Sequence, residues 1–365
     1  MYEIKLFNNF SVDLMIYFVG LIFSLIFIMI ILFSKRFHQN YTSDSFFGPQ
    51  KIHKKSTPRV GGLVIISSIL VQLLLIIGQD KNILITILIC SLPVFLAGFL
   101  EDIIKNIKPY IRLLSTLLSS FLVTFFLDIE ILKVGLEYFE KYIMVGFVPL
   151  ILTVLSIVLL TQALNIIDGL DGLALGTSVL IFSSLIYLSY LHQDKMIFNL
   201  ALIIFSSCFC LFIVNFLTGK IFLGDGGAYL LGYLSAVLLI MISSRNEEIS
   251  PFAILLIIIF PIYETIRSFI RRFFEKQSNS FQPDNRHLHS MIYICINNNS
   301  NFYKICPNKL SSCLTMIFPI SSTLLASIFY NNQTLLIILI FSTISFFELV
   351  IYYLNRKTIY HKSFE

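Results

Sequence analysis

The sequence predicts an all-α integral membrane protein, and two observations support this prediction. Hydrophobic residues make up 57% of the 365 residues and charged residues 13%, with a mean hydropathy of +0.86. Soluble domains are about 45–50% apolar and about 25% charged. Apolar runs of roughly 18–22 residues recur along the chain, and helices of that length cross a hydrocarbon core about 30 Å thick. We therefore expect a single membrane-embedded domain over residues 1–365.

The apolar runs predict about eleven transmembrane helices. They fall at residues 14–33, 60–78, 83–100, 110–127, 143–163, 173–191, 197–217, 228–243, 251–270, 311–330 and 334–353. The first run has the length of a signal peptide, but basic residues follow it and no small-residue cleavage site is present. We therefore expect it to be retained as the first span.

The distribution of Lys and Arg predicts the orientation in the membrane. An odd number of spans places the termini on opposite sides, and with the N-terminus outside, twenty of the 26 basic residues fall on the cytoplasmic side. The six outside are Lys5, Lys81, Lys133, Lys141, Lys195 and Arg245. The C-terminus is therefore predicted to be cytoplasmic. The same bias explains the net charge of +5, so no nucleic-acid partner is expected.

The most distinctive stretch is residues 161–174, Thr-Gln-Ala-Leu-Asn-Ile-Ile-Asp-Gly-Leu-Asp-Gly-Leu-Ala, which lies between two apolar runs. Asn165, Asp168 and Asp171 recur every three residues, and a glycine follows each aspartate. Carboxylates at the mouth of a membrane helix are costly unless a cavity, a cation or a partner charge receives them. The glycines indicate close approach of the backbone to another group. The alternative is a polar turn between two spans.

Two polar clusters come earlier in the chain. Before the second span, Lys54, Lys55 and Arg59 lead to a glycine pair at residues 61–62. These bases either anchor the helix at anionic headgroups or meet a phosphorylated ligand.

The second early cluster is Glu101-Asp102, at the cytoplasmic end of the third span. Adjacent carboxylates repel each other, and a bound metal ion or an exchangeable proton would relieve that repulsion. Alternatively, both acids pair with Lys105 and Lys108 one turn further on.

Asp225 lies between Gly224 and Gly226-Gly227 at the start of another span, and Lys220 precedes it. This pattern suits a Mg²⁺ ion held by one or two carboxylates and by substrate phosphates. Lys220 would supply a point charge for a phosphate. The glycines lack the P-loop spacing, so a nucleotide-binding P-loop is rejected.

The last cluster is Arg286-His287-Leu-His289. Histidines at i and i+2 share a face on an extended loop, and with Arg286 they suit a phosphate or diphosphate. Zinc is rejected because two histidines are too few ligands and the six cysteines form no Cys-x-x-Cys pair. Two isolated loop histidines remain the alternative.

All five clusters fall on the predicted cytoplasmic face, which favours a common function. Carboxylates that hold Mg²⁺, with lysine, arginine and histidine opposite phosphate oxygens, indicate metal-dependent handling of phosphates. The substrate at such a face can combine a lipid part that lies between helices with a water-soluble part from the cytosol.

The motifs resemble the polyprenyl-phosphate N-acetylhexosamine-1-phosphate transferases of glycosyltransferase family 4. The resemblance rests on Asn-Ile-Ile-Asp-Gly-Leu-Asp-Gly-Leu-Ala at residues 165–174 and Phe-Leu-Gly-Asp-Gly-Gly-Ala at 222–228. It also includes Lys-Ser-Thr-Pro-Arg-Val-Gly-Gly at 55–62 and the loop at 283–289. It implies transfer of a sugar 1-phosphate from a UDP-sugar to undecaprenyl phosphate, releasing UMP. It further implies Mg²⁺, with Mn²⁺ as an alternative, in a bacterial inner membrane protein that is compatible with a homodimer.

The resemblance also implies roles for individual residues. It makes Asp225 the metal ligand, with Asp168 assisting. It makes the acids of the other motifs catalytic, namely Glu101, Asp102, Asp168 and Asp171. The residues it implies in substrate binding are Asn165, Lys55, Thr57, Arg59, Asn215, Lys220, Arg286, His287 and His289.

The histidine motif bears on which sugar is transferred. His-Leu-His-Ser resembles the enzymes that start O-antigen, capsule and related polysaccharides, whereas the peptidoglycan enzyme usually shows three consecutive histidines. This favours UDP-GlcNAc or a 6-deoxy relative, with the phospho-N-acetylmuramoyl-pentapeptide reaction as the alternative. The chain departs from the family pattern at Glu101, Gln162 and Glu264, which replace the more common aspartate, asparagine and aspartate.

Two other functions are compatible with the composition. A transporter of lipid-linked sugars predicts charges near the middle of the membrane and inverted repeats, whereas these acids cluster at one interface and no two halves match. The three substitutions also leave open an inactive relative.

Overall fold

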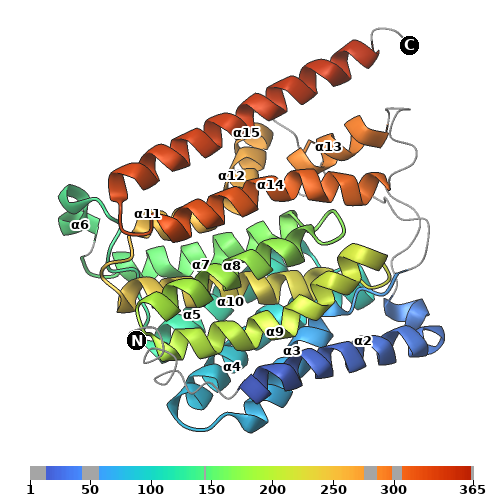
Figure 1. Ribbon diagram of the computed structural model, residues 1–365, viewed down its shortest axis with the longest axis horizontal. Helices are drawn as coiled ribbons and strands as arrows, with labels where there is room; N and C mark the ends of the chain where they lie inside the picture. The colour runs from blue at the N-terminus through green and yellow to red at the C-terminus, as the bar shows by residue number, and fades with distance from the viewer. Residues whose placement is uncertain (1–13, 43–56, 144, 275–285, 298–305, 363–365) are drawn as a thin grey trace, which may run out of the picture.

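The computed structural model describes residues 14–42, 57–143, 145–274, 286–297 and 306–362 (Figure 1). Every regular element in those ranges is an α-helix, which confirms the all-α prediction. The helices are α2 (Leu14–Thr42), α3 (Gly61–Leu75), α4 (Gln79–Ile104), α5 (Pro109–Leu127), α6 (Glu137–Ile143), α7 (Val148–Ile166), α8 (Leu173–Leu191), α9 (Lys195–Thr218), α10 (Gly224–Arg245), α11 (Pro251–Ile257), α12 (Ile259–Phe274), α13 (Leu288–Asn297), α14 (Pro307–Ile328) and α15 (Gln333–Lys362).

The predicted apolar runs all form helices, and the structure refines two of them. Within the described residues nine helices are long and apolar enough to cross a membrane, and a tenth span forms if α11 and α12 are counted together. That pair bends by 74° at its break, so the run at 251–270 is not one straight helix. The run at 60–78 yields only α3, whose 15 residues extend about 22 Å.

The backbone explains why α3 is short. At its start, Gly61 N–H donates to the Phe222 carbonyl at 2.9 Å and Gly62 N–H to the Leu223 carbonyl at 3.0 Å. The helix therefore begins against another loop rather than at the membrane surface. At its end, Ile76 is extended and Gly78 has a φ of +90°, a conformation that favours glycine.

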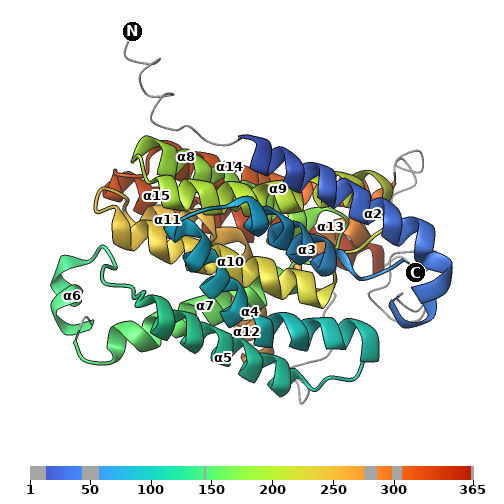
Figure 2. The ribbon, with the colours of Figure 1, turned by 90° about the horizontal axis from the view of Figure 1, so that it is seen from below.

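Helix α10 forms the centre of the bundle, with α3, α4, α7 and α8 packed around it (Figure 2). Of the apolar window in α10, 94% is buried. Close approach depends on glycine, because a Cβ on Gly98 of α4 would lie 2.7 Å from Gly226 N. A Cβ on Gly232 of α10 would likewise lie 2.6 Å from the Cα of Thr161 in α7. Small residues at these crossings let the membrane helices pack backbone to backbone.

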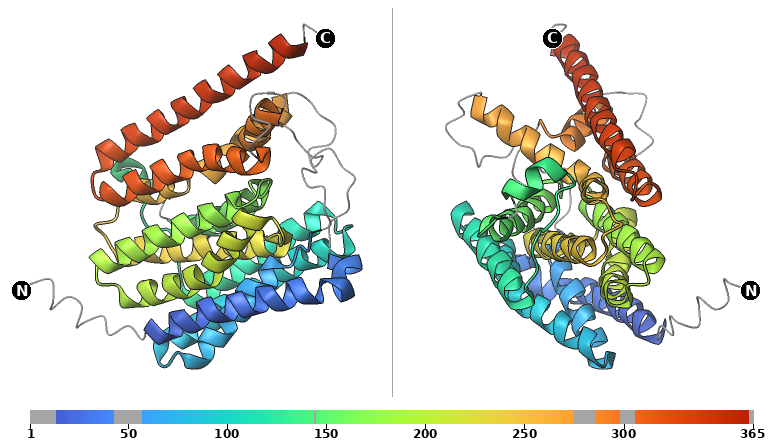
Figure 3. Two further views of the ribbon diagram at one scale, coloured as in Figure 1. Left: turned by 45° about the vertical axis from the view of Figure 1, so that its right-hand side comes forward. Right: turned by 90° about the vertical axis from the view of Figure 1, so that its left-hand side faces the viewer.

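The outer helices cover this core unequally. Helix α2 packs on α3 and α9, α5 on α4 and α7, and α14 on α8. Helix α15 lies at the edge and leans away from the rest of the bundle (Figure 3). Only 22% of its apolar window is buried, so most of its surface faces the lipid.

The polar loops lie at the two ends of the bundle. Helix α13 is at one end and α6 at the other (Figure 1). The acid and glycine motifs meet at the α13 end, as the contacts below show. The other end is closed by Asp194, which precedes α9 and pairs with Arg245 of α10 at 2.7 Å. That the α13 end faces the cytoplasm stays a prediction from the basic residues.

Candidate active site

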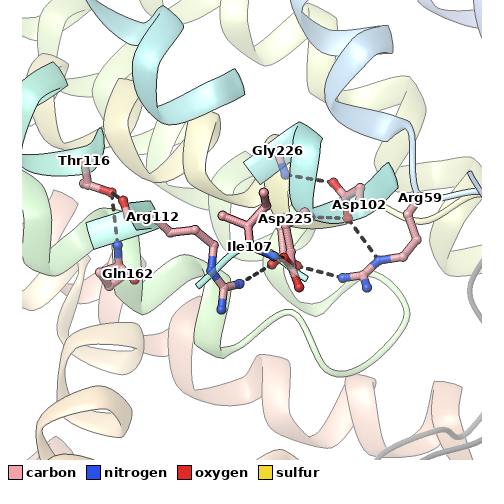
Figure 4. A network of polar contacts seen from close by, with 9 residues as sticks. Arg59, Asp102, Ile107, Arg112, Thr116, Gln162, Asp225 and Gly226 are labelled. Carbon is pink, nitrogen blue, oxygen red and sulfur yellow. Dashed lines mark hydrogen bonds and ion pairs between the residues drawn. The ribbon is translucent and has the colours of Figure 1, made fainter. Parts of the chain in front are cut away.

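Asp225 lies in the first turn of α10 between two arginines (Figure 4). Its Oδ1 is 2.7 Å from Nη2 of Arg59, and its Oδ2 is 2.8 Å from Nη1 of Arg112. The Asp225 side chain is 14% exposed. Arg59 comes from the segment before α3 and Arg112 from the first turn of α5. Both carboxylate oxygens are therefore engaged in charge-assisted contacts from opposite sides.

Arg59 is positioned by backbone contacts on both sides of it. Its own N–H donates to the Thr42 carbonyl at the end of α2 at 2.9 Å. The Pro58 carbonyl accepts the N–H of Phe222 at 2.9 Å. Since Phe222 in turn accepts from Gly61, the segment that carries Arg59 runs alongside the loop that leads into α10.

Asp102 caps the N-terminus of α10 from another helix. Its Oδ1 accepts the N–H of Asp225 at 3.0 Å, and its Oδ2 accepts the N–H of Gly226 at 3.0 Å. The first N–H groups of a helix have no partner within that helix, and they favour a negative charge. Asp102 is 2% exposed and also pairs with Nε of Arg59 at 3.2 Å. Gly224 has a φ of +77°, and a Cβ there would lie 2.6 Å from the Asp102 carboxylate.

Glu101, although adjacent to Asp102, contacts a different group. Its Oε2 accepts the N–H of Ile107 at 2.7 Å, which closes the turn between α4 and α5. Successive side chains on a helix diverge by about 100°. The two adjacent acids therefore have different hydrogen-bond partners. The structure does not bring Glu101 into contact with Asp225.

Asp168 shares the electrostatic environment of Asp225. It lies in the loop between α7 and α8, and its side chain is half-buried. The pKa of Asp168 is raised to about 7, mainly by desolvation; Arg59 lowers it, and the charges of Asp225 and Asp102 contribute to the rise. The loop therefore brings a second carboxyl group into the Asp225 cluster.

Asp171 makes a different set of contacts. Its N–H donates to Oδ1 of Asn308 at 3.0 Å, and its Oδ2 accepts from Nδ2 of the same residue at 3.2 Å. A Cβ on Gly219 would lie 2.9 Å from its carboxylate. Asp171 is 6% exposed. It joins the α7–α8 loop to the start of α14, so the structure shows an anchoring contact for this predicted catalytic acid.

Two of the predicted substrate-binding residues also contact backbone. Asn215 Oδ1 accepts the N–H of Gly172 at 2.6 Å, and its Nδ2 donates to the Ile221 carbonyl at 2.7 Å. Thr57 Oγ1 donates to the Gly219 carbonyl at 3.4 Å. Both side chains are buried, and they hold together the loops that meet at the start of α10.

Two further predicted binding residues lie in or beside the same loops. Asn165 is half-buried near the end of α7. Lys220 is exposed in the loop before α10. Lys55 lies outside the described residues.

The histidine pair lies against the Asp168 loop. The rings of His287 and His289 stack at a centroid distance of 5.5 Å and an interplanar angle of 6°. The sequence predicts a shared face on an extended loop, whereas His289 lies in the first turn of α13. His287 Nδ1 is 2.8 Å from Oε1 of Glu264, and Leu288 N–H donates to the same oxygen at 2.9 Å. A Cβ on Gly169 would lie 2.4 Å from Nε2 of His289. The glycine after Asp168 therefore permits the close approach that the sequence indicated.

Arg286 begins this loop. It is exposed, and its carbonyl accepts from Nη1 of Arg271 at 3.1 Å.

Sequence reasoning missed Arg112 and Asn308 as members of the site. Arg112 is a basic residue one turn inside an apolar helix. A charge at such a position indicates a buried partner of opposite charge. Asn308 follows Pro307 at the start of α14, and nothing in its local pattern points to Asp171, which is 137 residues away.

Asp225 and Asp168 supply oxygen donors that fit a divalent cation. Among the described residues, no group of three or more His, Cys, Asp or Glu side chains is gathered to hold a metal ion. A divalent cation held by these two carboxylates would complete its shell with waters and substrate phosphates.

Comparison with known proteins matches this chain to glycosyl transferase family 4 over residues 84–243. A probable undecaprenyl-phosphate N-acetylglucosaminyl 1-phosphate transferase of Bacillus subtilis (strain 168) is 31% identical over 245 residues, 66% of either chain. The undecaprenyl-phosphate alpha-N-acetylglucosaminyl 1-phosphate transferase of Thermotoga maritima is 28% identical over 66% of this chain and 69% of its own. A phospho-N-acetylmuramoyl-pentapeptide-transferase of Staphylococcus carnosus is 28% identical over 56% of this chain and 67% of its own.

Apolar helices with acids and arginines gathered at one end define a polytopic membrane enzyme that acts on charged groups. The chain belongs to glycosyl transferase family 4. Its matched segment spans about two thirds of the length of the first two relatives. Residues 84–243, which match the family model, include the Asp102, Asp168 and Asp225 motifs.

Proposed function

We propose that this protein transfers an N-acetylhexosamine 1-phosphate from a UDP-sugar to undecaprenyl phosphate. The products are undecaprenyl-diphosphate-sugar and UMP. The main support for the proposal is the position of Asp225, which lies between Arg59 and Arg112 at a helix N-terminus. The names of the relatives in Bacillus and Thermotoga, both N-acetylglucosaminyl 1-phosphate transferases, support the same reaction.

The arginines around Asp225 suit a diphosphate. Arginine binds phosphate oxygens through two parallel N–H donors, and the N-terminus of α10 favours negative charge. An incoming diphosphate competes with Asp225 for Arg59 and Arg112. The Asp225 oxygens are thereby released toward a cation. The stacked His287 and His289 supply further donors from across the Asp168 loop.

Asp225 and Asp168 would hold a bound Mg²⁺, with Mn²⁺ as the alternative. When bound, the cation neutralises charge on the phosphoryl oxygens and polarises them. The pKa of Asp168 is raised to about 7. Its carboxyl group can contribute an oxygen to a cation or exchange a proton with the lipid phosphate, and both roles require it to be ionised.

Asp102 acts as a positioning residue in this proposal. The family resemblance implied a catalytic role for it. Its 2% exposure and its contacts with Arg59 and two backbone N–H groups favour a different role. It fixes where Asp225 and Arg59 lie relative to each other.

GlcNAc is the first candidate for the sugar. The two N-acetylglucosaminyl transferases match 66% of this chain, whereas the muramoyl-pentapeptide enzyme matches 56%. The leucine between His287 and His289 points the same way. We place the reaction at the cytoplasmic face of a bacterial plasma membrane, as the first membrane step of O-antigen, capsule or a related polysaccharide.

A panel of radiolabelled UDP-sugars tests the proposal. Purified protein in detergent is incubated with undecaprenyl phosphate, Mg²⁺ and each UDP-N-acetylhexosamine in turn, and radioactivity is counted in the lipid extract. We expect label in the lipid with UDP-GlcNAc or a close relative. Absence of a lipid product with every sugar would instead favour the transporter or the inactive relative.

A further inference from the structure

Helix α15 carries one acid within its apolar span, Glu348. It lies about 22 Å along the helix from Gln333, and its side chain is 46% exposed among residues that face lipid. Its Oε1 accepts from Nε of Arg267 at 2.8 Å and from the hydroxyl of Tyr263 at 2.9 Å. An ionisable group at this depth is costly and is by default a candidate for function.

Both partners of Glu348 lie on α12, one turn apart. Helix α12 follows the 74° break after α11, and its buried side packs against α7 and α14. Its exposed apolar residues are Ile266, Phe269, Ile270, Phe273 and Phe274. The contact with Glu348 therefore joins α15 to a helix whose later part projects from the bundle (Figure 3).

The same segment of α12 holds the histidine loop on another face. Glu264, adjacent to Tyr263, accepts from Leu288 N–H and contacts His287 Nδ1. Arg271, one turn after Arg267, donates to the Arg286 carbonyl at 3.1 Å. Glu264 is 1% exposed, so its contact with the loop excludes water.

The histidine loop tolerates little displacement. His289 lies so close to Gly169 that a single added carbon there would be 2.4 Å from its ring. A shift of α12 would carry Glu264, and with it His287, away from the Asp168 loop. A misplacement of about 1 Å can cost an enzyme about 10²-fold in rate.

We propose that Glu348 is a positioning residue that holds α12, and through Glu264 the His287–His289 pair, against the Asp168 loop. The expected effect of Glu348 on catalysis rests on the proposed function, whereas its effect on the position of the histidines does not. Phe347 separately holds α15 to the start of α12, through ring contacts with Tyr263 at 5.2 Å and Phe260 at 6.2 Å. Loss of the acid therefore frees the later part of α12 while the helices stay together.

Two readouts on the full chain test this role. Hydrogen exchange of residues 288–292, at the start of α13, reports the position of this segment without any need for activity. The KM for the UDP-sugar reports the same position during turnover. We expect Glu348→Leu to speed exchange in that segment while α8 is unchanged. We also expect it to lower kcat/KM for the UDP-sugar about tenfold or more, with the KM for undecaprenyl phosphate unaltered.

The controls separate positioning from general damage. Ser345→Leu alters an exposed site three residues earlier on α15 and should leave both readouts unchanged. Glu348→Gln keeps an acceptor for Tyr263 and should fall between wild type and Glu348→Leu. The double variant Arg267→Glu with Glu348→Arg restores an ion pair and should recover slow exchange.

Unchanged exchange in Glu348→Leu would overturn the proposal, and so would altered exchange with unaltered kcat/KM. If the wild-type protein transfers no sugar phosphate, the proposed function fails while the exchange measurement still decides the role of Glu348.

Discussion

The Asp102 carboxylate accepts the backbone N–H of Asp225, so a buried acid at the end of α4 fixes the residue that begins α10. Arg59 touches both acids, at 3.2 Å from Asp102 and 2.7 Å from Asp225. The three side chains thus form one charge-compensated unit from three separate segments. Its two acids have different surroundings, because Asp225 is partly exposed and Asp102 is not.

Asp225→Asn should reduce UMP release by about 10³-fold or more, because it removes the carboxylate proposed to hold the cation. The measurement is UMP release by purified protein with saturating Mg²⁺. Asp194→Asn is the matched control, since Asp194 is also a buried acid paired with arginine but lies at the opposite end. Activity of Asp225→Asn near that of wild type would refute the metal assignment.

Asp102→Asn should lower the free energy of unfolding by about 1–3 kcal/mol, because one N–H of α10 loses its acceptor. Chemical unfolding in detergent measures this change. Glu101→Gln serves as the comparison, since its amide oxygen still accepts from Ile107 N–H, and it should unfold close to wild type. If both variants unfold like wild type, Asp102 does not act as the cap.

Gly169→Ala should lower kcat/KM by about tenfold to a hundredfold while the melting temperature stays close to wild type. The residue has no left-handed backbone angle, so alanine fits the backbone, but the added methyl would meet His289 at 2.4 Å. Gly176→Ala is the control, because the nearest atom there is the flexible end of Met316. Equal activity of the two variants would contradict the proposed contact between the histidine and the loop.

The Mg²⁺ requirement should depend on pH through Asp168. In the metal-free protein desolvation raises the pKa of this carboxyl group to about 7, so it binds a proton below that pH and cannot then hold a cation. The Mg²⁺ concentration for half-maximal activity should therefore rise about tenfold per pH unit below the pKa. Titrations on either side of pH 7 check this. A constant requirement, or the same dependence in Asp168→Asn, would exclude Asp168.

The helices and the position of the site motifs were predictable because their signals are local. Each apolar run formed a helix, and the glycine after Asp168 marked a real close approach. Local spacing could not say which way the acids point. Asp168 and Asp171 are three residues apart, yet one joins Asp225 and the other joins Asn308, 137 residues further along the chain.

Other features depended on tertiary contacts that no window of sequence contains. Helix α3 is short because its glycines bond to the Phe222 loop. No role for Arg112 is predicted from the sequence, and its pairing with Asp225 depends on how α5 packs on α4 and α7. Glu264 was noted only as a departure from a family pattern, whereas the structure shows it holding the histidine loop.

The central claim is that the sugar moves together with its phosphate. UDP-GlcNAc with radioactive phosphorus in the β-phosphate tests it directly, in an incubation with undecaprenyl phosphate, Mg²⁺ and the purified protein. The account predicts that the label enters the lipid extract and that UMP is the nucleotide released. Label that stays in the aqueous phase as UDP, while the sugar enters the lipid, would contradict it.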